Sequence, residues 1–487
     1  MNKNKKTIFL VVLQGFGARY LLRSDIFKNL KDAGARLVIL TSNADEDYFI
    51  EEFKDDNVFI EKFESEKCLE YYSKSKLQKL FKILRWVTTN GASDIKTVED
   101  HYKVFKQESK FMKGPWGSIN EKILDSVVWV LRHSSILRKL IIRIESRMFP
   151  GNFHNHLFEK YKPSTVITTT LGNIEPGYDA YIMREAKKHN AKVITLILSW
   201  DNPSSKGLGG AIPDRIITWT DTMKKEMVEY HDMRPDRIFT GGVAHFDIYY
   251  RDDQIMSRDE LFDMFGFDKN RKLIFLGTKS PNTYPWNPEL VEILGRAIED
   301  NLFDFPCQLL TRLHPIHFKY NKGTPLYSKI LAKYEHAKEK YPHVFYSIPR
   351  ILSKKLYFDM PRDEMVILAS ILKHSDVLVN MFSTLSIEAA IFQLPVINVC
   401  FEGHGNGGRT KAMQNIFIDY NQVHNQRIIK TGGVRTAFSK EELIKYINMY
   451  LKNRNLDKEN REQIIQNECG PFPGRAGERI ADYIIQL

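Results

Sequence analysis

Apolar runs and amphipathic stretches alternate over the first forty residues of the chain. Residues 7–13 are mostly apolar, and residues 36–41 form a second apolar run. Between the two runs, Leu22, Ile26 and Leu30 recur at helical spacing behind a loop that contains two glycines. This order predicts a buried strand, a loop, a helix and a second strand, as in a Rossmann-like unit with a parallel sheet.

The glycine loop has two interpretations. Gly15 and Gly17 suggest a dinucleotide-binding G-x-G-x-x-G loop, but Tyr20 stands at the third glycine position and no suitable acidic residue follows the second strand. The alternative is a tight turn beneath a second substrate, because glycine lets the backbone approach closely. On this interpretation Gly15, Gly17 and Arg19 are predicted to bind an acceptor.

The same alternation resumes at residue 164 and starts again at residue 272, after a charged helical linker. Strands that alternate with helices indicate a parallel sheet, whose ligands bind beyond the carboxyl ends of the strands. We therefore predict two Rossmann-like α/β domains that face each other across a cleft. The first covers residues 1–245 and the second covers residues 255–465.

The region of about residues 65–150 differs from both domains, because it is basic, aromatic and helical in its periodicity. Within residues 126–149, one helical face is apolar and another is basic, with Glu145 as the single acid. The apolar face holds Leu137, Leu140, Ile141, Ile144 and Met148, and the basic face holds Arg132, Lys139, Arg143 and Arg147. Residues 77–86 repeat the pattern. We predict a helical insertion that lies on an anionic membrane surface, with a core helix that has a solvated basic face as the alternative.

Composition and charge narrow the class of partner. The 487 residues are 43% hydrophobic and carry a net charge of +11, which favours nucleotides or anionic lipid. A recognisable nucleic-acid module is missing, so nucleic acid is not expected. No apolar run reaches the roughly 20 residues that cross a bilayer. The four cysteines are far apart in sequence, which fits a reducing compartment. The expected location is the cytoplasm, peripheral to the inner face of the cell membrane.

Residues 375–399 hold a candidate phosphate site. An apolar run ends at Asn380, Ser383 or Thr384 then caps a short helix, and a second apolar run follows. The free N–H groups of a helix start can bind phosphate, and Glu388 lies one turn further, within reach of a hydroxyl on the same ligand. An ordinary strand–helix–strand unit with a well-capped helix is the alternative.

Three further candidates stand at predicted strand ends in the same domain. Lys279 ends one strand, and Arg312 and His314 end the next one. Together with the capped helix, they are predicted to bind the diphosphate of a nucleotide donor and to stabilise its leaving charge. His314 and His317 lack acidic or cysteine partners nearby in sequence, so we expect no metal and no other cofactor.

Transfer from such a donor also needs a base for the acceptor hydroxyl. Asp201 is the first candidate, since it follows a long apolar strand and adjoins Trp200, which could raise its pKa by limiting solvation. Glu175 and Asp179 are the reserve candidates, and Lys206 is a candidate acceptor contact beyond the same strand end. The alternative for Asp201 is a turn residue before Asn-Pro, and for the others it is ordinary surface charge.

These motifs resemble the GT-B glycosyltransferase superfamily. The similarity rests on the R-L-H-P strand end at 312–315, the run from Ser375 to Asn398 and the G-G-V-x-x-F-D linker at 241–247. The chain is most similar to the branch that includes CDP-glycerol glycerophosphotransferases and UDP-N-acetylglucosamine 2-epimerases. The resemblance implies a C-terminal donor domain, an N-terminal acceptor domain and a last helix, within residues 466–487, that returns to the first domain.

The resemblance also implies a function. It puts His314 near the donor diphosphate, Ser383 and Thr384 at its phosphates and Glu388 near its ribose. The expected enzyme moves a sugar (or a polyol phosphate) from a nucleotide-activated donor to a cell-surface glycan or lipid-linked acceptor in polysaccharide biosynthesis. A nucleotide-sugar 2-epimerase and a non-catalytic, membrane-associated scaffold are the alternatives. The acidic residues that a 2-epimerase uses find no match in this sequence.

Overall fold

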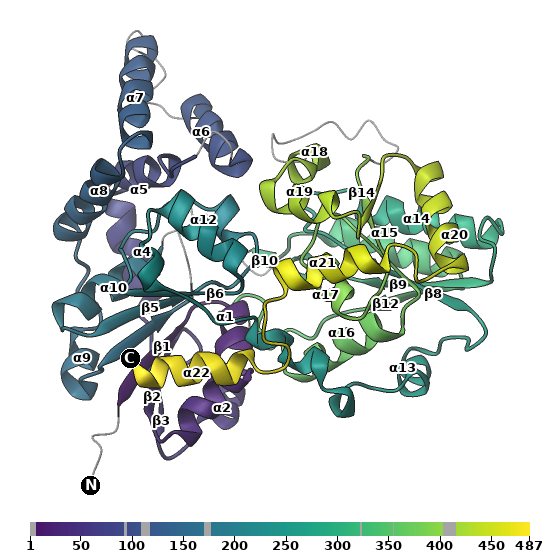
Figure 1. Cartoon of the computed structure of the whole chain (residues 1–487), viewed down its shortest axis with the longest axis horizontal. Coiled ribbons are helices and arrows are strands. Elements are labelled where there is room, and N and C mark those ends of the chain that lie inside the picture. Colours follow the sequence, from purple (N-terminus) through teal and green to yellow (C-terminus); the bar gives the residue numbers. More distant parts are fainter. Residues whose placement is uncertain are drawn as a thin grey trace. The chain divides into compact units, whose positions relative to one another are not determined.

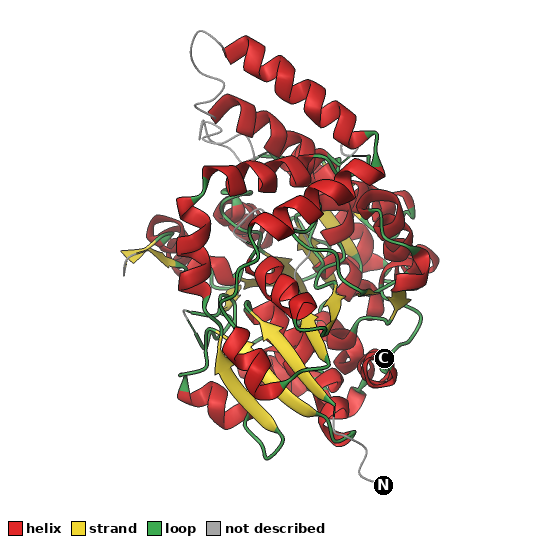
Figure 2. Ribbon diagram, turned by 90° about the vertical axis from the view of Figure 1, so that its left-hand side faces the viewer, coloured by secondary structure: helices red, strands yellow, loops and turns green. Residues whose placement is uncertain are grey.

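The computed structural model describes residues 6–91, 95–108, 117–169, 177–321, 324–353, 355–402 and 415–487. It divides into two compact units. Unit 1 comprises Met1–His245, Ser353–Asp359 and Arg475–Leu487, and unit 2 comprises Phe246–Leu352 and Met360–Gly474. Each unit has a parallel sheet with helices around it (Figures 1 and 2). The predicted fold class, two parallel-sheet α/β domains with a helical insertion in the first, is confirmed.

The sheet of unit 1 has seven strands in the order β3-β2-β1-β4-β5-β6-β7, and all neighbours are parallel. The strands are β1 (Thr7–Val12), β2 (Arg36–Thr41), β3 (Val58–Lys62), β4 (Thr165–Thr168), β5 (Lys192–Leu196), β6 (Arg215–Thr218) and β7 (Ile238–Thr240). Their apolar side chains, such as Phe9, Val38 and Val166, are fully buried, as expected for a sheet covered on both faces. After β3 the chain returns to the other side of β1 and adds β4 there. The strand order therefore reverses between β1 and β4, and the switch point of unit 1 lies at the carboxyl ends of these two strands.

Helices of unit 1 cover this sheet. They are α1 (Gly15–Gly17), η1 (Ala18–Leu22), α2 (Asp25–Asp32), α3 (Asp47–Phe53), α9 (Asn155–Tyr161), α10 (Tyr178–Lys188), α11 (Asn202–Ser205), α12 (Asp221–His231) and α22 (Ala476–Gln486). The last helix, α22, packs on α2 in unit 1 (Figure 1). Gly477 permits this approach, because a Cβ there would lie 2.7 Å from the Asp25 Cβ. Tyr483 of α22 stacks on Phe239 of β7, with 3.9 Å between the ring centroids.

The described part of the insertion between β3 and α9 contains five helices. They are α4 (Ser65–Lys74), α5 (Lys76–Val87), α6 (Lys96–Glu108), α7 (Gly117–Arg132) and α8 (Ser135–Met148). A small apolar cluster around Trp86, Val98 and Val128 joins α5, α6 and α7. Gly207, after α11, lies directly against Trp86, so that the insertion also contacts the loops of the sheet. Within the described ranges, no helix combines the length and the apolar character that a bilayer span requires.

Residues 353–359 belong to unit 1, although their neighbours in sequence belong to unit 2. A buried carboxylate holds them in place. Asp359 pairs with Arg23 at 2.5 Å and accepts a hydrogen bond from the Tyr48 hydroxyl at 2.6 Å. Arg23 also pairs with Glu52 at 2.7 Å, so its single charge faces two carboxylates. This buried network ties the segment to the helices that follow β1 and β2.

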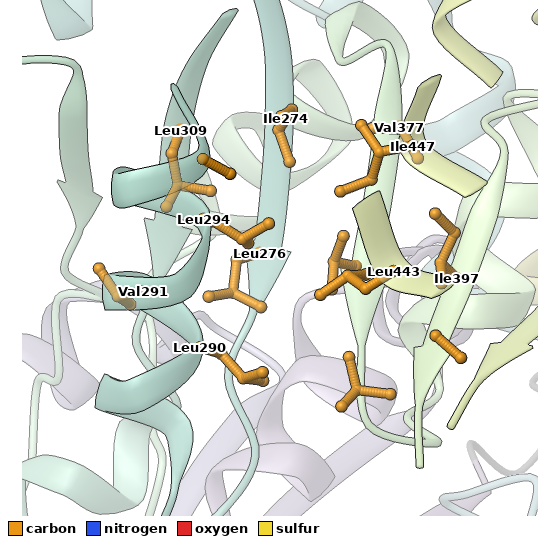
Figure 3. Packing of buried hydrophobic residues seen from close by; sticks show 14 of the residues in the cluster. Ile274, Leu276, Leu290, Val291, Leu294, Leu309, Val377, Ile397, Leu443 and Ile447 are labelled. Carbon is orange, nitrogen blue, oxygen red and sulfur yellow. The ribbon is translucent and has the colours of Figure 1, made fainter. Parts of the chain in front are cut away.

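The main sheet of unit 2 has six parallel strands in the order β12-β9-β8-β13-β14-β15. The strands are β8 (Lys272–Gly277), β9 (Cys307–Arg312), β12 (Val344–Ser347), β13 (Val377–Asn380), β14 (Val396–Val399) and β15 (Arg435–Ala437), beside a small antiparallel pair, β10 (Tyr320–Asn321) and β11 (Thr324–Pro325). The helices are α13 (Arg258–Phe265), α14 (Asn287–Glu299), α15 (Ser328–Lys340), α16 (Asp363–His374), α17 (Leu385–Ile391), α18 (Ile416–Tyr420), α19 (Val423–Lys430), α20 (Lys440–Lys452) and α21 (Lys458–Glu468). Figure 3 shows Leu290 and Leu294 of α14 and Leu443 and Ile447 of α20 packed on the strands.

Candidate functional site

The switch point of unit 2 lies between β8 and β13. From β8 the chain adds β9 and β12 on one side, and it then returns to add β13, β14 and β15 on the other side. In open α/β sheets, the crevice beyond the carboxyl ends of the strands at such a reversal is where ligands bind. Lys279 follows β8 and Ser383 follows β13, so both predicted residues stand at this position.

Three strand ends meet through direct contacts there. The Lys279 ammonium donates to the Met381 carbonyl, 3.2 Å away and just past β13. It also pairs with Asp419 of α18 at 2.7 Å. On the other side, the His314 N–H donates to the Thr278 hydroxyl at 2.8 Å, which links the end of β9 to the end of β8. Lys279 thus holds a positive charge at a fixed position. A phosphate that binds there would displace Asp419 or share the ammonium with it.

His314 is a neutral imidazole with an assigned tautomer. Its Nδ1 accepts the Ile316 N–H at 3.1 Å, so the ring proton is on Nε2. Burial first, and then the neighbouring His317 and Lys279, lower its pKa to about 4. At neutral pH the imidazole is therefore not a cation, and its Nε2–H is the ring group that can donate a hydrogen bond. His317 is fully buried and contacts the His314 carbonyl and the Tyr334 hydroxyl.

The helix start after β13 differs in detail from the predicted cap. Thr384 occupies the N-cap position of α17 but makes no side-chain cap bond, whereas the Ser383 hydroxyl accepts the Leu385 N–H at 3.3 Å. Phe382, just before them, has a φ of 51°, a left-handed conformation that turns the chain sharply at this point. Ser383 is thus held beside the switch point by a local turn.

Two other predicted donor residues have protein partners. Glu388 is buried and accepts a hydrogen bond from the Tyr249 hydroxyl, so a ribose would have to replace that hydroxyl. Arg312 contacts Ser347 of β12 at 2.7 Å and pairs with Glu364 of α16 at 2.6 Å. Because β12 lies on the far side of β9 from β8, the Arg312 charge is directed away from the switch point. We assign it a structural contact.

The glycine loop of unit 1 stands at the other switch point, after β1. The Gly15 N–H donates to the Tyr357 carbonyl at 2.7 Å, and a Cβ at Gly15 would overlap the backbone of Phe358 and Asp359. The close approach that Gly15 permits is therefore that of residues 353–359 of the same chain. At Gly17, a Cβ would lie 3.2 Å from the Thr169 Oγ1, at the end of β4.

The candidate bases are placed as follows. Asp201 is the N-cap residue of α11, and its two carboxylate oxygens accept hydrogen bonds from the Ser199 hydroxyl and, at 2.9 Å, the Ser205 hydroxyl. This is the geometry of the turn residue that was the alternative, and the catalytic role stays a prediction. Asp179 is buried in the first turn of α10. Glu175 lies outside the described residues.

The charges of Lys206 and Arg19 each help to lower the pKa of a nearby histidine. Lys206 follows α11, and its charge adds to burial in lowering the pKa of His101. Arg19 lies near His245, whose pKa is well below its usual range, first because of burial and then because of the Arg19 charge. The His245 ring lies 5.1 Å from that of Tyr20, the residue that occupies the third glycine position. A neutral, ring-packed histidine beside the glycine loop was not among the predicted site residues, although it follows directly on the strand-end sequence T-G-G-V-A.

The prediction that the protein holds no metal can be compared with the described residues only. There, no group of three or more His, Cys, Asp or Glu side chains has the arrangement that could hold a metal ion. The chemistry available at the unit 2 switch point is that of a lysine, a neutral histidine and a hydroxyl-lined helix start. Such groups suit a diphosphate.

Comparison with known proteins adds the fold class. No protein-family model and no curated protein sequence matches the chain. Among solved structures, UDP-GlcNAc 2-epimerase from Methanocaldococcus jannaschii has 12% identity and a TM-score of 0.51, with 99% of this chain and 100% of that chain covered. UDP-GlcNAc 2-epimerase from Neisseria meningitidis, bound to UDP-GlcNAc, has 10% identity and a TM-score of 0.52 over 99% of this chain and 100% of that one. The S. aureus MnaA-UDP co-structure has 10% identity and a TM-score of 0.52 over 98% and 96%.

These similarities extend over both units of the chain. The protein has a GT-B-like fold, as the sequence motifs predicted.

Proposed function

We propose that the protein is a GT-B-type transferase that uses a nucleotide-activated sugar. The carrying observation is the convergence of Lys279, His314 and Ser383 at the switch point of unit 2, from the ends of three neighbouring strands. A solved structure of similar fold, the N. meningitidis epimerase, is bound to UDP-GlcNAc, which supports a nucleotide sugar as the ligand. The proposed acceptor is a cell-surface glycan or a lipid-linked molecule.

In this proposal the donor diphosphate is held by groups of different chemistry. Lys279 supplies a positive charge, and its pairing with Asp419 keeps the ammonium in place before the donor arrives. His314 donates from Nε2 to a phosphate oxygen without adding a second charge. As the bond to the sugar breaks, both contacts strengthen with the growing negative charge on the leaving diphosphate. The acceptor hydroxyl loses its proton to a base, for which Asp201 remains the proposal.

Nucleotide binding tests the site directly. A thermal-shift panel with CMP, CDP, UDP, GDP and ADP should show stabilisation by one nucleotide, about 2.7 kcal/mol at 100 times its dissociation constant. His314→Ala and Lys279→Met should each weaken that nucleotide about 10- to 100-fold, since a hydrogen bond to a charged group contributes about 1.5–3 kcal/mol. His336→Ala, on the exposed side of α15, is the matched control and should bind normally. Unchanged affinity in both site variants would remove the diphosphate assignment.

Two other functions make different predictions. A 2-epimerase, the activity named for two of the compared structures, would convert the nucleotide sugar without an acceptor. A non-catalytic scaffold would bind no nucleotide, and Asp201→Asn would change no activity. Release of free nucleotide that depends on an added acceptor, and that Asp201→Asn abolishes with nucleotide affinity retained, supports the transferase over both.

A further inference from the structure

Helices α7 and α8 expose an unusual number of large apolar side chains. No other pair of successive helices in the described ranges carries as many. The exposed side chains are Ile119, Ile123, Val127, Trp129 and Val130 on α7 and Ile136, Leu140, Ile144 and Met148 on α8. Single exposed apolar residues are normal, but a contiguous group of them marks a contact surface.

On α8 these side chains form a stripe with a row of cations beside it. Ile136, Leu140, Ile144 and Met148 are spaced by four residues, and Lys139, Arg143 and Arg147 precede the last three by one residue each. A step of one residue is about 100° around a helix, so the two rows lie on adjacent faces. The apolar stripe faces solvent, with Ile136 77% exposed and Leu140 44% exposed.

The buried side of α8 is polar instead. Its buried residues are Arg138, Ile142 and Glu145. Arg138 makes two hydrogen bonds to Asp232, at 2.6 and 2.7 Å, and Glu145 pairs with Arg85 at 2.7 Å. Among the described residues, charged groups anchor α8 and its apolar stripe stays 38–77% exposed, so the core-helix interpretation is wrong for α8. It holds for the end of α7, where Val128 and Leu131 are buried.

A basic cavity adjoins the row of cations. It has a volume of about 600 Å³ and is formed by α8, the end of α10 and five residues from loops and segment ends, Pro150, Asn152, Ala211, Ile212 and Arg237. Its charged lining consists of Arg143, Arg147, Arg184, Glu185, Lys187, Lys188 and Arg237. Glu185, the one acid among them, accepts the backbone N–H groups of Phe153 and His154 at 2.7 and 2.8 Å. Among the described residues, no carboxylate lies within ion-pair distance of Arg143, Arg147 or Arg237.

We propose that α8 and this cavity form a docking site for an anionic phospholipid membrane. The apolar stripe enters the boundary between headgroups and acyl chains, as in interfacial helices with a basic polar face. The cavity takes the phosphate of a lipid headgroup, for which the planar forks of Arg143 and Arg147 are suited. Its volume falls in the range of small-molecule sites, about 300–1,000 Å³.

Charge decides against a second copy of the chain as the occupant of this surface. A two-fold dimer would place the same patch on both subunits, and the unpaired cations beside the stripe would face each other. An anionic lipid surface neutralises them. The proposal concerns the α8 surface alone and does not rest on the nucleotide site.

Vesicle co-sedimentation of the full chain tests the proposal. Vesicles of phosphatidylcholine with 30% phosphatidylglycerol should bind the protein, and pure phosphatidylcholine should bind it much less. Arg143→Gln with Arg147→Gln should reduce the partition coefficient about 30-fold, because each basic residue near an anionic surface contributes about 1 kcal/mol. The matched control is Lys329→Gln with Lys333→Gln, two exposed cations four residues apart on α15, which should bind like the parent protein.

Each outcome bears on the proposal. Binding that survives the arginine changes, or that falls equally in the α15 control, would overturn it. Leu140→Ser with Ile144→Ser gives an independent check on exposed positions and should also release the protein from the mixed vesicles. If this second variant instead converts a dimer to a monomer in sedimentation velocity runs without vesicles, the stripe is covered by a second copy and the lipid site is wrong.

Discussion

The buried carboxylate of Glu145 lies between two arginines, and its removal should destabilise unit 1 strongly. Its Oε2 is 2.7 Å from the Arg85 Nε, and its Oε1 is 3.0 Å from the Arg184 Nη2. The three side chains are only 3–4% exposed. Arg85 belongs to α5, Arg184 to α10 and Glu145 to α8, so one carboxylate joins the helical insertion to a helix of the central sheet.

Glu145→Gln keeps the size of the side chain and removes its charge. Two guanidinium groups then remain buried with no compensating anion, although both keep backbone carbonyl contacts, Arg85 to Leu208 and Arg184 to Phe149. Breaking a buried pair by removing one partner costs about 3–5 kcal/mol. The free energy of unfolding of unit 1 should fall by that amount.

Urea denaturation followed by tryptophan fluorescence is a suitable assay, because Trp86, Trp200 and Trp219 lie in unit 1. With a urea dependence of about 1–3 kcal/mol/M, the midpoint should drop by at least about 1 M. The control is Glu70→Gln, which breaks an i,i+4 pair with Lys74 whose side chains are 64% and 72% exposed. Because water screens a pair this exposed, its loss should barely change the midpoint. If both variants shift the midpoint equally, the buried triad does not anchor the insertion.

Two other features of unit 1 have measurable consequences. Burial lowers the pKa of His231 to about 4, below its usual 6.5, so the unfolded chain binds a proton that the folded chain rejects. Stability should rise with pH from about 4 to 6.5, by up to about 1.4 kcal/mol per pH unit, and His231→Gln, which can still donate to the Pro203 carbonyl, should remove this share. Coincident pH profiles would contradict the assignment. Gly15→Ala should undock residues 353–359 and speed trypsin cleavage after Lys355, while Gly177→Ala, where a Cβ meets nothing within 4 Å, should not. Equal cleavage rates would show that the contact at Gly15 tolerates a Cβ.

The sheets could be predicted because a parallel strand covered on both faces is a continuous apolar run. Residues 8–12 are such a run, and all five are buried. The order of strands in a sheet is less visible in the sequence. Arg312 and His314 end the same strand, yet Arg312 contacts β12 and His314 contacts the end of β8. Only the position of β9 between those two strands separates their roles.

Residues 126–149 form the end of α7 and all of α8, and the choice between the membrane and core interpretations required information that these helices do not contain. An amphipathic pattern identifies two faces, but the buried one is chosen by partners elsewhere in the chain. For α8 these partners are Arg85, Arg184 and Asp232, which come from three other segments. Ion pairs with these partners hold the side chains of Arg138 and Glu145 on the buried side of α8. The signal available in the sequence was the single acid of a basic helix, Glu145. Such a carboxylate anchors the helix when buried arginines from other segments pair with it, as Arg85 and Arg184 do here.

The net charge alone therefore indicates little about the function of this protein. The partners of each cation are more informative, because they separate structural cations from those that can bind a ligand. The side chains of Arg85, Arg138 and Arg184 are buried and pair with carboxylates, and these ion pairs join segments of unit 1. Arg143 and Arg147 belong to the same helix as Arg138 but meet no carboxylate among the described residues. Unpaired cations that line a cavity repel one another, and an anionic ligand relieves that repulsion. The lipid site is inferred from this contrast within one helix.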